Sequence, residues 1–168
     1  EKIAQHLGHA VKLEIEPGRF LVAEAGVLVS QVRAVKSMGS RHFVVVDAGF
    51  SDLMRPSMYG SYHHISLMAG DERAIDEQQT IDTVVAGPLC ESGDVFTQLE
   101  GGMVEPRAMP AAKVGDYLVF HDTGAYGASM SSNYNSRPLI PEVLFEQGQP
   151  REIRRAQTIE SLLALEID

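Results

Sequence analysis

The 168-residue sequence has one cysteine, no tryptophan and few basic side chains for its number of acidic ones. A single cysteine forms no disulfide within the chain, which is typical of proteins of the reducing cytoplasm. Lys and Arg total 14 against 23 Asp and Glu, so the formal net charge is −9. Nucleic-acid binding depends on clustered Lys and Arg. The charge balance therefore argues against a nucleic-acid partner and is typical of a well-solvated surface.

Long apolar runs are also lacking. No run approaches the roughly 20 residues needed to span a bilayer, and the opening E-K-I-A-Q-H-L-G-H lacks the apolar centre of a signal peptide. We therefore expect a cytoplasmic protein with no membrane partner. The sequence does not open on Met, so we expect a processed chain or a piece of a longer one. The adjacent pair His63-His64 would point to opposite faces of a strand, so no metal site is expected.

What the sequence does contain from Gly26 onward is a series of short, near-alternating, β-branched segments separated by turn residues. Strands are expected over residues 27–36, 42–47, 81–86, 95–98, 117–121, 142–145 and 152–154. The first two form a hairpin around Met38-Gly39-Ser40, and Pro106 and Pro110 bracket a connection. A helix is expected over Thr158–Leu165, with Thr158 as its N-cap. Little helix elsewhere predicts a mainly β barrel or sandwich.

The first 25 residues have a different, βα-like character. Gly8 and Pro17-Gly18 break this stretch into short elements. A helix end, a strand and a short helix are expected over Glu1–Leu7, Lys12–Glu16 and Leu21–Ala25. The change of texture predicts two units, residues 1–25 and a β domain over 26–168.

Two motifs carry groups suited to binding anions. In E-P-G-R, Glu16 to Arg19, Gly18 allows the backbone to approach a ligand closely, and Arg19 offers a planar fork of donors. In D-L-M-R-P-S-M-Y-G, Arg55 and Tyr59 are four apart and would share one face of a helical turn, which suits a carboxylate. The structural alternatives are a plain turn with a solvated Arg and a loop with an aromatic anchor.

Two further motifs carry candidate chemistry. In G-P-L-C-E-S-G-D, the thiol of Cys90 could exchange a proton at a reacting carbon, and Glu91 could hold an ammonium group. The alternative is a buried structural thiol. In D-T-G-A-Y-G-A-S-M-S-S-N-Y-N, Tyr126 stands between Gly124 and Gly127 and could offer its hydroxyl to a phosphate. An ordinary surface loop would have a similar composition.

The order of these four motifs resembles the C-terminal part of the diaminopimelate decarboxylase family, which are pyridoxal-phosphate-dependent decarboxylases built like alanine racemase. The resemblance runs from about Leu13 to the end. It implies that residues 1–25 are the remnant of a (β/α)8 cofactor barrel and that residues 26–168 are the C-terminal β domain. It also implies a homodimer with active sites at the subunit interface, which converts meso-diaminopimelate to L-lysine and CO2 with pyridoxal 5'-phosphate as cofactor.

The resemblance also implies a role for each candidate residue. Cys90 would protonate the carbanion left by CO2, and Glu91 would bind the far amino group, both from the partner subunit. Arg55 and Tyr59 would receive a substrate carboxylate. The segment that approaches the cofactor phosphate and the substrate would consist of Glu16, Pro17, Gly18 and Arg19, and Tyr126 would contact both.

Two alternatives stay open at this point. The residues C-E-S-G-D favour diaminopimelate, because related ornithine and arginine decarboxylases typically have Asp after the cysteine. A decarboxylase of another basic amino acid or carboxylated polyamine remains the nearest alternative. The chain has only Lys2, Lys12, Lys36 and Lys113, none in the motif of the family's cofactor-anchoring lysine. We therefore expect the chain alone to be inactive, and a non-catalytic dimerisation or regulatory β domain is the other alternative.

Overall fold

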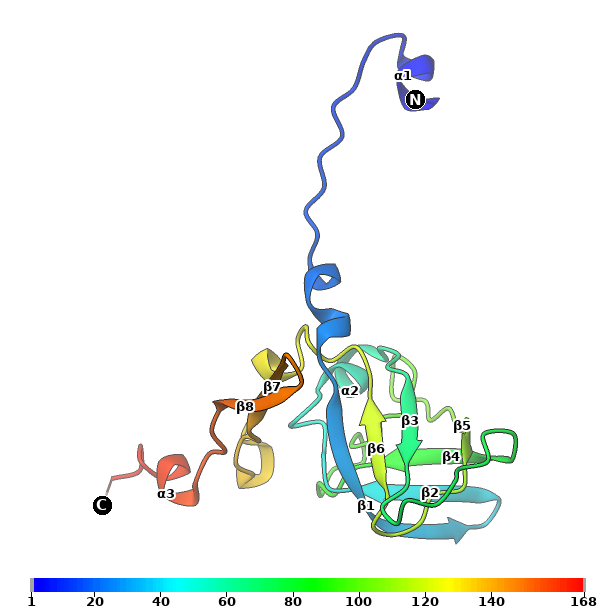
Figure 1. Cartoon of the computed structure of the whole chain (residues 1–168), viewed down its shortest axis with the longest axis vertical. Coiled ribbons are helices and arrows are strands. Elements are labelled where there is room, and N and C mark those ends of the chain that lie inside the picture. The colour runs from blue at the N-terminus through cyan, green and yellow to red at the C-terminus, as the bar shows by residue number, and fades with distance from the viewer. Residues whose placement is uncertain (1, 168) are drawn as a thin grey trace.

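The computed structural model describes residues 2–167, so Glu1, the expected start of the first helix, lies outside the described residues. Six strands form one mixed sheet in the order β3-β6-β1-β2-β4-β5 (Figure 1). Its two edge strands, β3 and β5, also contact each other, so the sheet is nearly closed into a barrel. The strand bounds are β1 Leu28–Met38, β2 Arg41–Val46, β3 Ile65–Met68, β4 Thr80–Ala86, β5 Arg107–Pro110 and β6 Tyr117–Phe120. The expected mainly β architecture is confirmed.

The predicted hairpin forms the centre of this sheet. β1 pairs antiparallel with β2 across a turn in which Gly39 has a φ of +61°, a conformation that glycine adopts without strain. β1 also pairs antiparallel with β6, whereas β2 and β4 run parallel. Alternate side chains of these strands point inward and make the core. Its fully buried members include Val32, Val46, Val85, Leu118 and Phe120.

Other predicted elements are partly right. The strands expected over 142–145 and 152–154 form a separate hairpin, β7 Glu142–Glu146 with β8 Gln149–Arg154. The Thr158 side chain caps the last helix as predicted, accepting a hydrogen bond from the Ser161 amide at 3.1 Å. That helix, α3, covers only Ile159–Leu162. The segment 95–98 makes isolated bridges, Ala86 with Val95 and Gln98 with Val104, instead of a strand.

Two predictions were wrong, and one strand was not predicted. The segment Lys12–Glu16 is extended but forms no strand, because a strand needs a hydrogen-bonded neighbour and this segment has none among the described residues. The stretch that Pro106 and Pro110 were expected to bracket as a connection contains β5, an edge strand where proline is tolerated. β3 was not anticipated, because Ile65–Met68 is short and follows two histidines.

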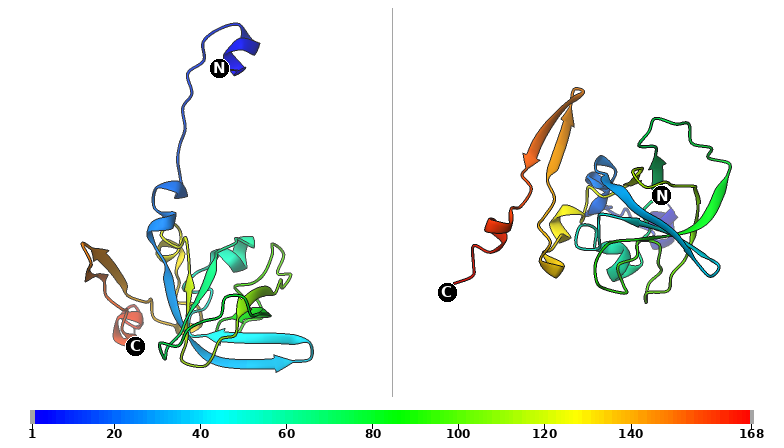
Figure 2. Two further views of the ribbon diagram at one scale, coloured as in Figure 1. Left: turned by 45° about the vertical axis from the view of Figure 1, so that its right-hand side comes forward. Right: turned by 90° about the horizontal axis from the view of Figure 1, so that it is seen from below.

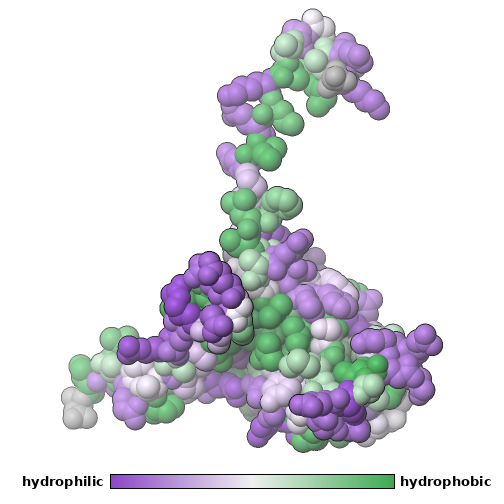
Figure 3. All heavy atoms as spheres, in the orientation of Figure 1, coloured by the Kyte–Doolittle hydropathy of each residue, from purple (hydrophilic) through white to green (hydrophobic). Residues whose placement is uncertain are grey.

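The chain extends beyond the barrel in two places. Figures 1 and 2 show an N-terminal arm that leads from helix α1 (Lys2–Leu7) down to the barrel, and the β7–β8 hairpin lying apart from it. Two short 3-10 helices, η1 Arg19–Leu21 and η2 Ala23–Ala25, join the arm to β1. Two more, η3 Ala128–Met130 and η4 Tyr134–Ser136, follow β6. In Figure 3 apolar side chains gather along the arm and at its base. Leu13 and Ile15, which belong to the arm, are 84% and 75% exposed.

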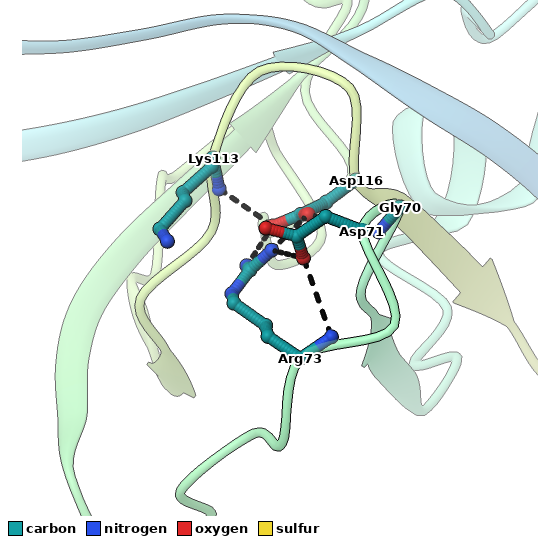
Figure 4. A network of polar contacts seen from close by, with 5 residues as sticks. All are labelled: Gly70, Asp71, Arg73, Lys113 and Asp116. Atoms are coloured by element: carbon teal, nitrogen blue, oxygen red, sulfur yellow. Dashed lines mark hydrogen bonds and ion pairs between the residues drawn. The ribbon is translucent and has the colours of Figure 1, made fainter.

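A charged network fixes the far end of the barrel (Figure 4). Asp116 is buried, and its carboxylate accepts hydrogen bonds from the Gly70 and Lys113 amides at 3.1 and 2.7 Å. Arg73 pairs with the same carboxylate and with Asp71. The network ties the loop after β3 to the turn before β6. No helix among residues 2–167 is long and apolar enough to cross a membrane. The boundary near Gly26 stays a prediction.

Candidate active site

A pocket of about 320 Å³ opens where the N-terminal arm meets the barrel. Its wall carries two guanidinium groups, two carboxylates and one buried histidine among the described residues. The lining residues are Arg19, Phe20, Ala23, Glu24, Arg55, Ser61, Tyr62, His63, Asp122 and Ala125. No lysine is among them. The mixed charges suit a ligand that carries both anionic and cationic groups.

The pocket exists because the arm is joined to the loop after β6. The Gly124 amide donates to the Ala23 carbonyl at 3.0 Å, and the Thr123 amide donates to the Gly26 carbonyl at 2.9 Å. A Cβ on Gly124 would overlap the Val22 carbonyl oxygen. Two backbones can approach this closely only where glycine stands. The join brings the E-P-G-R segment and Tyr126 to the same place.

Arg55 and Tyr59 lie as their spacing predicted. They begin and end the short helix α2, Arg55–Tyr59, which has Pro56 in its first turn and closes on Gly60 with a φ of +60°. The guanidinium carbon of Arg55 lies 5.1 Å from the ring centroid of Tyr59 and 5.2 Å from that of Tyr126. Two aromatic faces thus hold the cation through cation–π attraction. One nitrogen donates to the Ser61 hydroxyl at 3.2 Å, and the remaining donors can bind an anion.

Tyr126 stands over the end of the arm. Its hydroxyl lies 3.8 Å from the position that a Cβ on Gly18 would occupy. Its backbone has a φ of +62°, which is uncommon for a tyrosine and is found where surrounding structure enforces it. Gly18, Arg19, Arg55 and Tyr126 therefore gather at one site, as expected. Glu16 and Pro17 precede this site on the exposed arm.

The loop that carries Cys90 is built around Asp94. One oxygen of this carboxylate accepts from the Leu89 amide and the other from the Phe50 amide, both at 2.7 Å. Asp94 is 3% exposed, and burial raises its pKa. A Cβ on Gly87 would overlap the same carboxylate. Cys90 itself is exposed, so the alternative of a buried structural thiol is wrong.

Glu91, beside Cys90, presents an oriented carboxylate. Its Oε1 accepts from the Gly93 amide at 3.1 Å and from the Ser92 hydroxyl at 3.2 Å. Its Oε2 accepts from the Tyr134 hydroxyl at 3.4 Å. The Gly93 amide first, and then the Ser92 hydroxyl, hold the pKa of Glu91 below its usual range. The charged form is therefore favoured, as binding an ammonium group requires.

Neither Cys90 nor Glu91 lines the pocket. The described chain thus presents two separate groups: the pocket with Arg19, Arg55 and Tyr126 near its wall, and an exposed loop with Cys90 and Glu91. His63 is buried and its Nδ1 donates to the His121 carbonyl at 2.8 Å, and residues 2–167 contain no cluster of three or more metal-binding side chains.

The sequence did not reveal Tyr134, Glu24 or Asp122 as parts of these groups. The Tyr134 ring packs against Phe50 with centroids 4.8 Å apart, which aims its hydroxyl at Glu91. The one local signal was its position in the Ser- and Asn-rich segment that also contains Tyr126. Glu24 and Asp122 reach the pocket only because the arm and the loop are joined.

The chain belongs to the family described as "Pyridoxal-dependent decarboxylase, C-terminal sheet domain", whose profile matches residues 19–124. It is 76% identical over 167 residues to the diaminopimelate decarboxylase of Escherichia coli (strain K12), and that match covers 99% of this chain and 40% of the relative. A diaminopimelate decarboxylase of Streptomyces coelicolor is 64% identical over 169 residues, covering 99% and 38%. The chain thus spans about 40% of the length of the curated relatives it matches.

Solved structures of diaminopimelate decarboxylases are similar to this chain as well. A crystal structure of diaminopimelate decarboxylase, 76% identical, superposes with a TM-score of 0.87 over 98% of this chain and 39% of that one. The enzyme from M. jannaschii in complex with L-lysine is 38% identical, with a TM-score of 0.78 over 91% and 32%. A viral arginine decarboxylase bound to agmatine is 21% identical, with a TM-score of 0.59 over 72% and 30%, and shares the fold alone.

Proposed function

We propose that this chain is the C-terminal part of a diaminopimelate decarboxylase, which converts meso-2,6-diaminopimelate to L-lysine and CO2. The observation that carries the substrate assignment is Glu91, a charged and oriented carboxylate next to an exposed thiol. A diamino-dicarboxylate has a second ammonium group that such a carboxylate can bind. The similarity to relatives of that name supports the same assignment.

The residues at the arm fit the phosphate end of pyridoxal phosphate. The Tyr126 hydroxyl faces the backbone of Gly18. Because glycine has no side chain, the space between the hydroxyl and this backbone stays open. Arg19, the residue after Gly18, lines the neighbouring pocket. A hydroxyl, a glycine backbone and a guanidinium are the donors that a phosphate binds. When bound, the cofactor delocalises the electrons that remain when CO2 leaves. None of the four lysines of the chain stands in the motif of the family's cofactor-anchoring lysine, so we place that lysine outside this chain.

Arg55, Glu91 and Cys90 have separate roles in substrate binding and proton transfer. Arg55, held between Tyr59 and Tyr126, binds a substrate carboxylate through its free donors. Glu91 binds the far ammonium group and so holds the other end of the substrate in place for reaction. Cys90 then donates its thiol proton to the carbon that has lost CO2, forming the C–H bond of lysine and leaving a thiolate.

We propose a homodimer in which the loop of one subunit completes the pocket of the other. Support comes from the separation of the two groups: Cys90 and Glu91 are exposed and do not line their own chain's pocket. We place the enzyme in the cytoplasm, where the exposed thiol of Cys90 stays reduced. We propose neither a nucleic-acid partner nor a membrane partner.

The function is tested in the complete enzyme, meaning this chain joined to its own cofactor barrel or substituted for the matching 167 residues of the Escherichia coli relative. CO2 release is measured with meso-diaminopimelate, ornithine and arginine as substrates, and L-lysine is identified as the product from diaminopimelate. We expect turnover of diaminopimelate alone, and none by this chain in isolation. Faster turnover of ornithine or arginine would contradict the substrate assignment.

A further inference from the structure

Helix α2 contacts the Cys90–Glu91 loop on the side away from Arg55. The Ser57 hydroxyl, in the middle of the helix, donates to the Gly93 carbonyl at 2.8 Å. Residues two apart on a helix do not share a face, so Arg55 and Ser57 serve different neighbours. We propose that Ser57, together with Gln98, is a positioning residue that orients Glu91. This inference rests on the proposed role of Glu91 in binding the far ammonium group.

The Gly93 carbonyl is unusually well held. It accepts from the Ser57 hydroxyl, from the Gln98 side-chain amide at 3.0 Å and from the Val95 backbone amide at 2.8 Å. Gln98 is only 4% exposed, and the same amide nitrogen lies 2.6 Å from the Val95 carbonyl. The two groups that the Gln98 side chain meets, the carbonyls of Gly93 and Val95, only accept hydrogen bonds. The nitrogen of the Gln98 amide, and not its oxygen, therefore faces them. A buried amide fixed in this way has no freedom to follow the loop if the loop moves.

The backbone amide of Gly93 is the group that orients Glu91. Its amide N–H donates to Glu91 Oε1 at 3.1 Å. The glycine backbone rotates easily on its own, so the bonds from Ser57 and Gln98 to the Gly93 carbonyl restrict the conformations of Gly93 and with them the directions open to this N–H. A continuous set of hydrogen bonds therefore runs from Ser57 through Gly93 to the carboxylate of Glu91.

In the proposed dimer, these hydrogen bonds connect α2 to two active sites. Helix α2 carries Arg55 for the pocket of its own subunit and supports Glu91 for the pocket of the partner. The carboxylate receptor of one site and the ammonium receptor of the other are then parts of one rigid unit. Ser57 thereby contributes to the position that Glu91 takes in the partner's pocket, where it meets the far ammonium group of the substrate.

The test is a double-mutant cycle in the complete enzyme, with meso-diaminopimelate as substrate. Ser57→Ala removes one donor from Gly93, and we expect the KM to rise about fivefold with a smaller change in kcat, the usual effect of one lost hydrogen bond. Ser57→Thr keeps the hydroxyl and should restore most of the affinity. In a Glu91→Gln background, Ser57→Ala should change the KM less than twofold, because both variants act through the same carboxylate. Ser37→Ala, in the β1–β2 hairpin, is the matched control and should leave the KM unchanged.

The outcomes separate the two proposals. An effect of Ser57→Ala that persists undiminished in the Glu91→Gln background overturns the positioning role and leaves the proposed function intact. An unchanged KM for Glu91→Gln itself contradicts the role of Glu91 in the proposed function, and the positioning role with it. If Ser57→Ala does not fold, Ser57→Cys takes its place in the cycle, since a thiol is a weaker donor of similar size.

Discussion

The carboxylate of Asp94 accepts a hydrogen bond from the Leu89 amide at 2.7 Å and so fixes the residue directly before Cys90. The same carboxylate reaches across to the Phe50 amide, also at 2.7 Å. Since each of these amides is buried, neither can turn to water for another acceptor. The position of the exposed thiol thus depends on one buried acid.

Asp94→Asn tests this dependence. An Asn side chain has one acceptor oxygen where Asp has two, so one of the two amides loses its partner. We expect a loss of stability of about 1–3 kcal/mol, measured by thermal or urea unfolding of this chain. In the complete enzyme kcat should fall as well, because the Cys90 loop is displaced. Unfolding and turnover identical to the parent's would show that Asp94 does not hold the loop. Asp76→Asn, in an exposed turn, is the control.

Cys90→Ala tests the proton donor. In the complete enzyme we expect kcat for diaminopimelate to fall roughly 10²–10⁴-fold, the usual contribution of a general acid. Cofactor binding, followed by its visible absorbance, should be unchanged because the groups proposed to hold the phosphate, Gly18, Arg19 and Tyr126, are intact. Turnover at the parent's rate would refute the assignment, whereas loss of the cofactor would show that the substitution acts on folding.

Gly124→Ala tests the join between the arm and the barrel. A methyl group here overlaps the Val22 carbonyl, so the two backbones must separate. We expect this chain to lose about 2–3 kcal/mol of unfolding free energy, as overpacked sites do. The control is Gly39→Ala, which has open space around it and a φ of +61°. It should cost only about 1 kcal/mol, from the backbone strain alone. Equal losses for the two variants would contradict the close approach.

The pH dependence of stability should report the Asp116 network of Figure 4. Arg73, together with the Lys113 and Gly70 amides, lowers the pKa of Asp116 from its ordinary 3.8 to about 2. A lowered folded-state pKa means that the charged form stabilises the fold above pH 3.8. That contribution is lost as the pH falls from about 4 toward 2.

Asp116→Asn removes this contribution and supplies the measurement. We expect its Tm to lie roughly 5 °C or more below that of the parent at pH 6, and the difference to shrink as the pH falls below 4. Asp82→Asn, on an exposed part of β4, should show no comparable change. A difference between Asp116→Asn and the parent that stays constant from pH 6 to 2.5 would contradict the lowered pKa.

Local sequence patterns predicted the elements whose partners are close in the chain. The β1–β2 hairpin follows from alternation on either side of Gly39. The spacing of Arg55 and Tyr59 agreed with the helical turn that α2 forms, but a loop was the open alternative. Lys12–Glu16 has the same alternation as a strand, yet it stays unpaired in the described chain because pairing depends on a neighbour. Alternation therefore predicts which face is apolar, and topology decides whether a strand forms.

In the candidate site, too, local features could be predicted from the sequence and contacts between distant segments could not. The motifs singled out Cys90 and Glu91 as candidates, since the chemistry of their side chains is local. The contact of Glu91 with Tyr134 was not predictable, because 43 positions separate the two residues and folding alone brings them together. Asp94 was visible in its motif, but its burial and its bond to the Phe50 amide depend on packing between distant segments.

Mixed dimers of the complete enzyme test the shared active site most directly. Cys90→Ala and Arg55→Ala subunits carry different tags, are co-expressed, and are purified as mixed dimers. If the loop of one subunit serves the pocket of the other, each mixed dimer has one intact site and one with both defects. We predict that mixed dimers form L-lysine from meso-diaminopimelate at about half the parent's rate, while each variant alone is nearly inactive. Mixed dimers no more active than either variant would contradict a site built from two subunits.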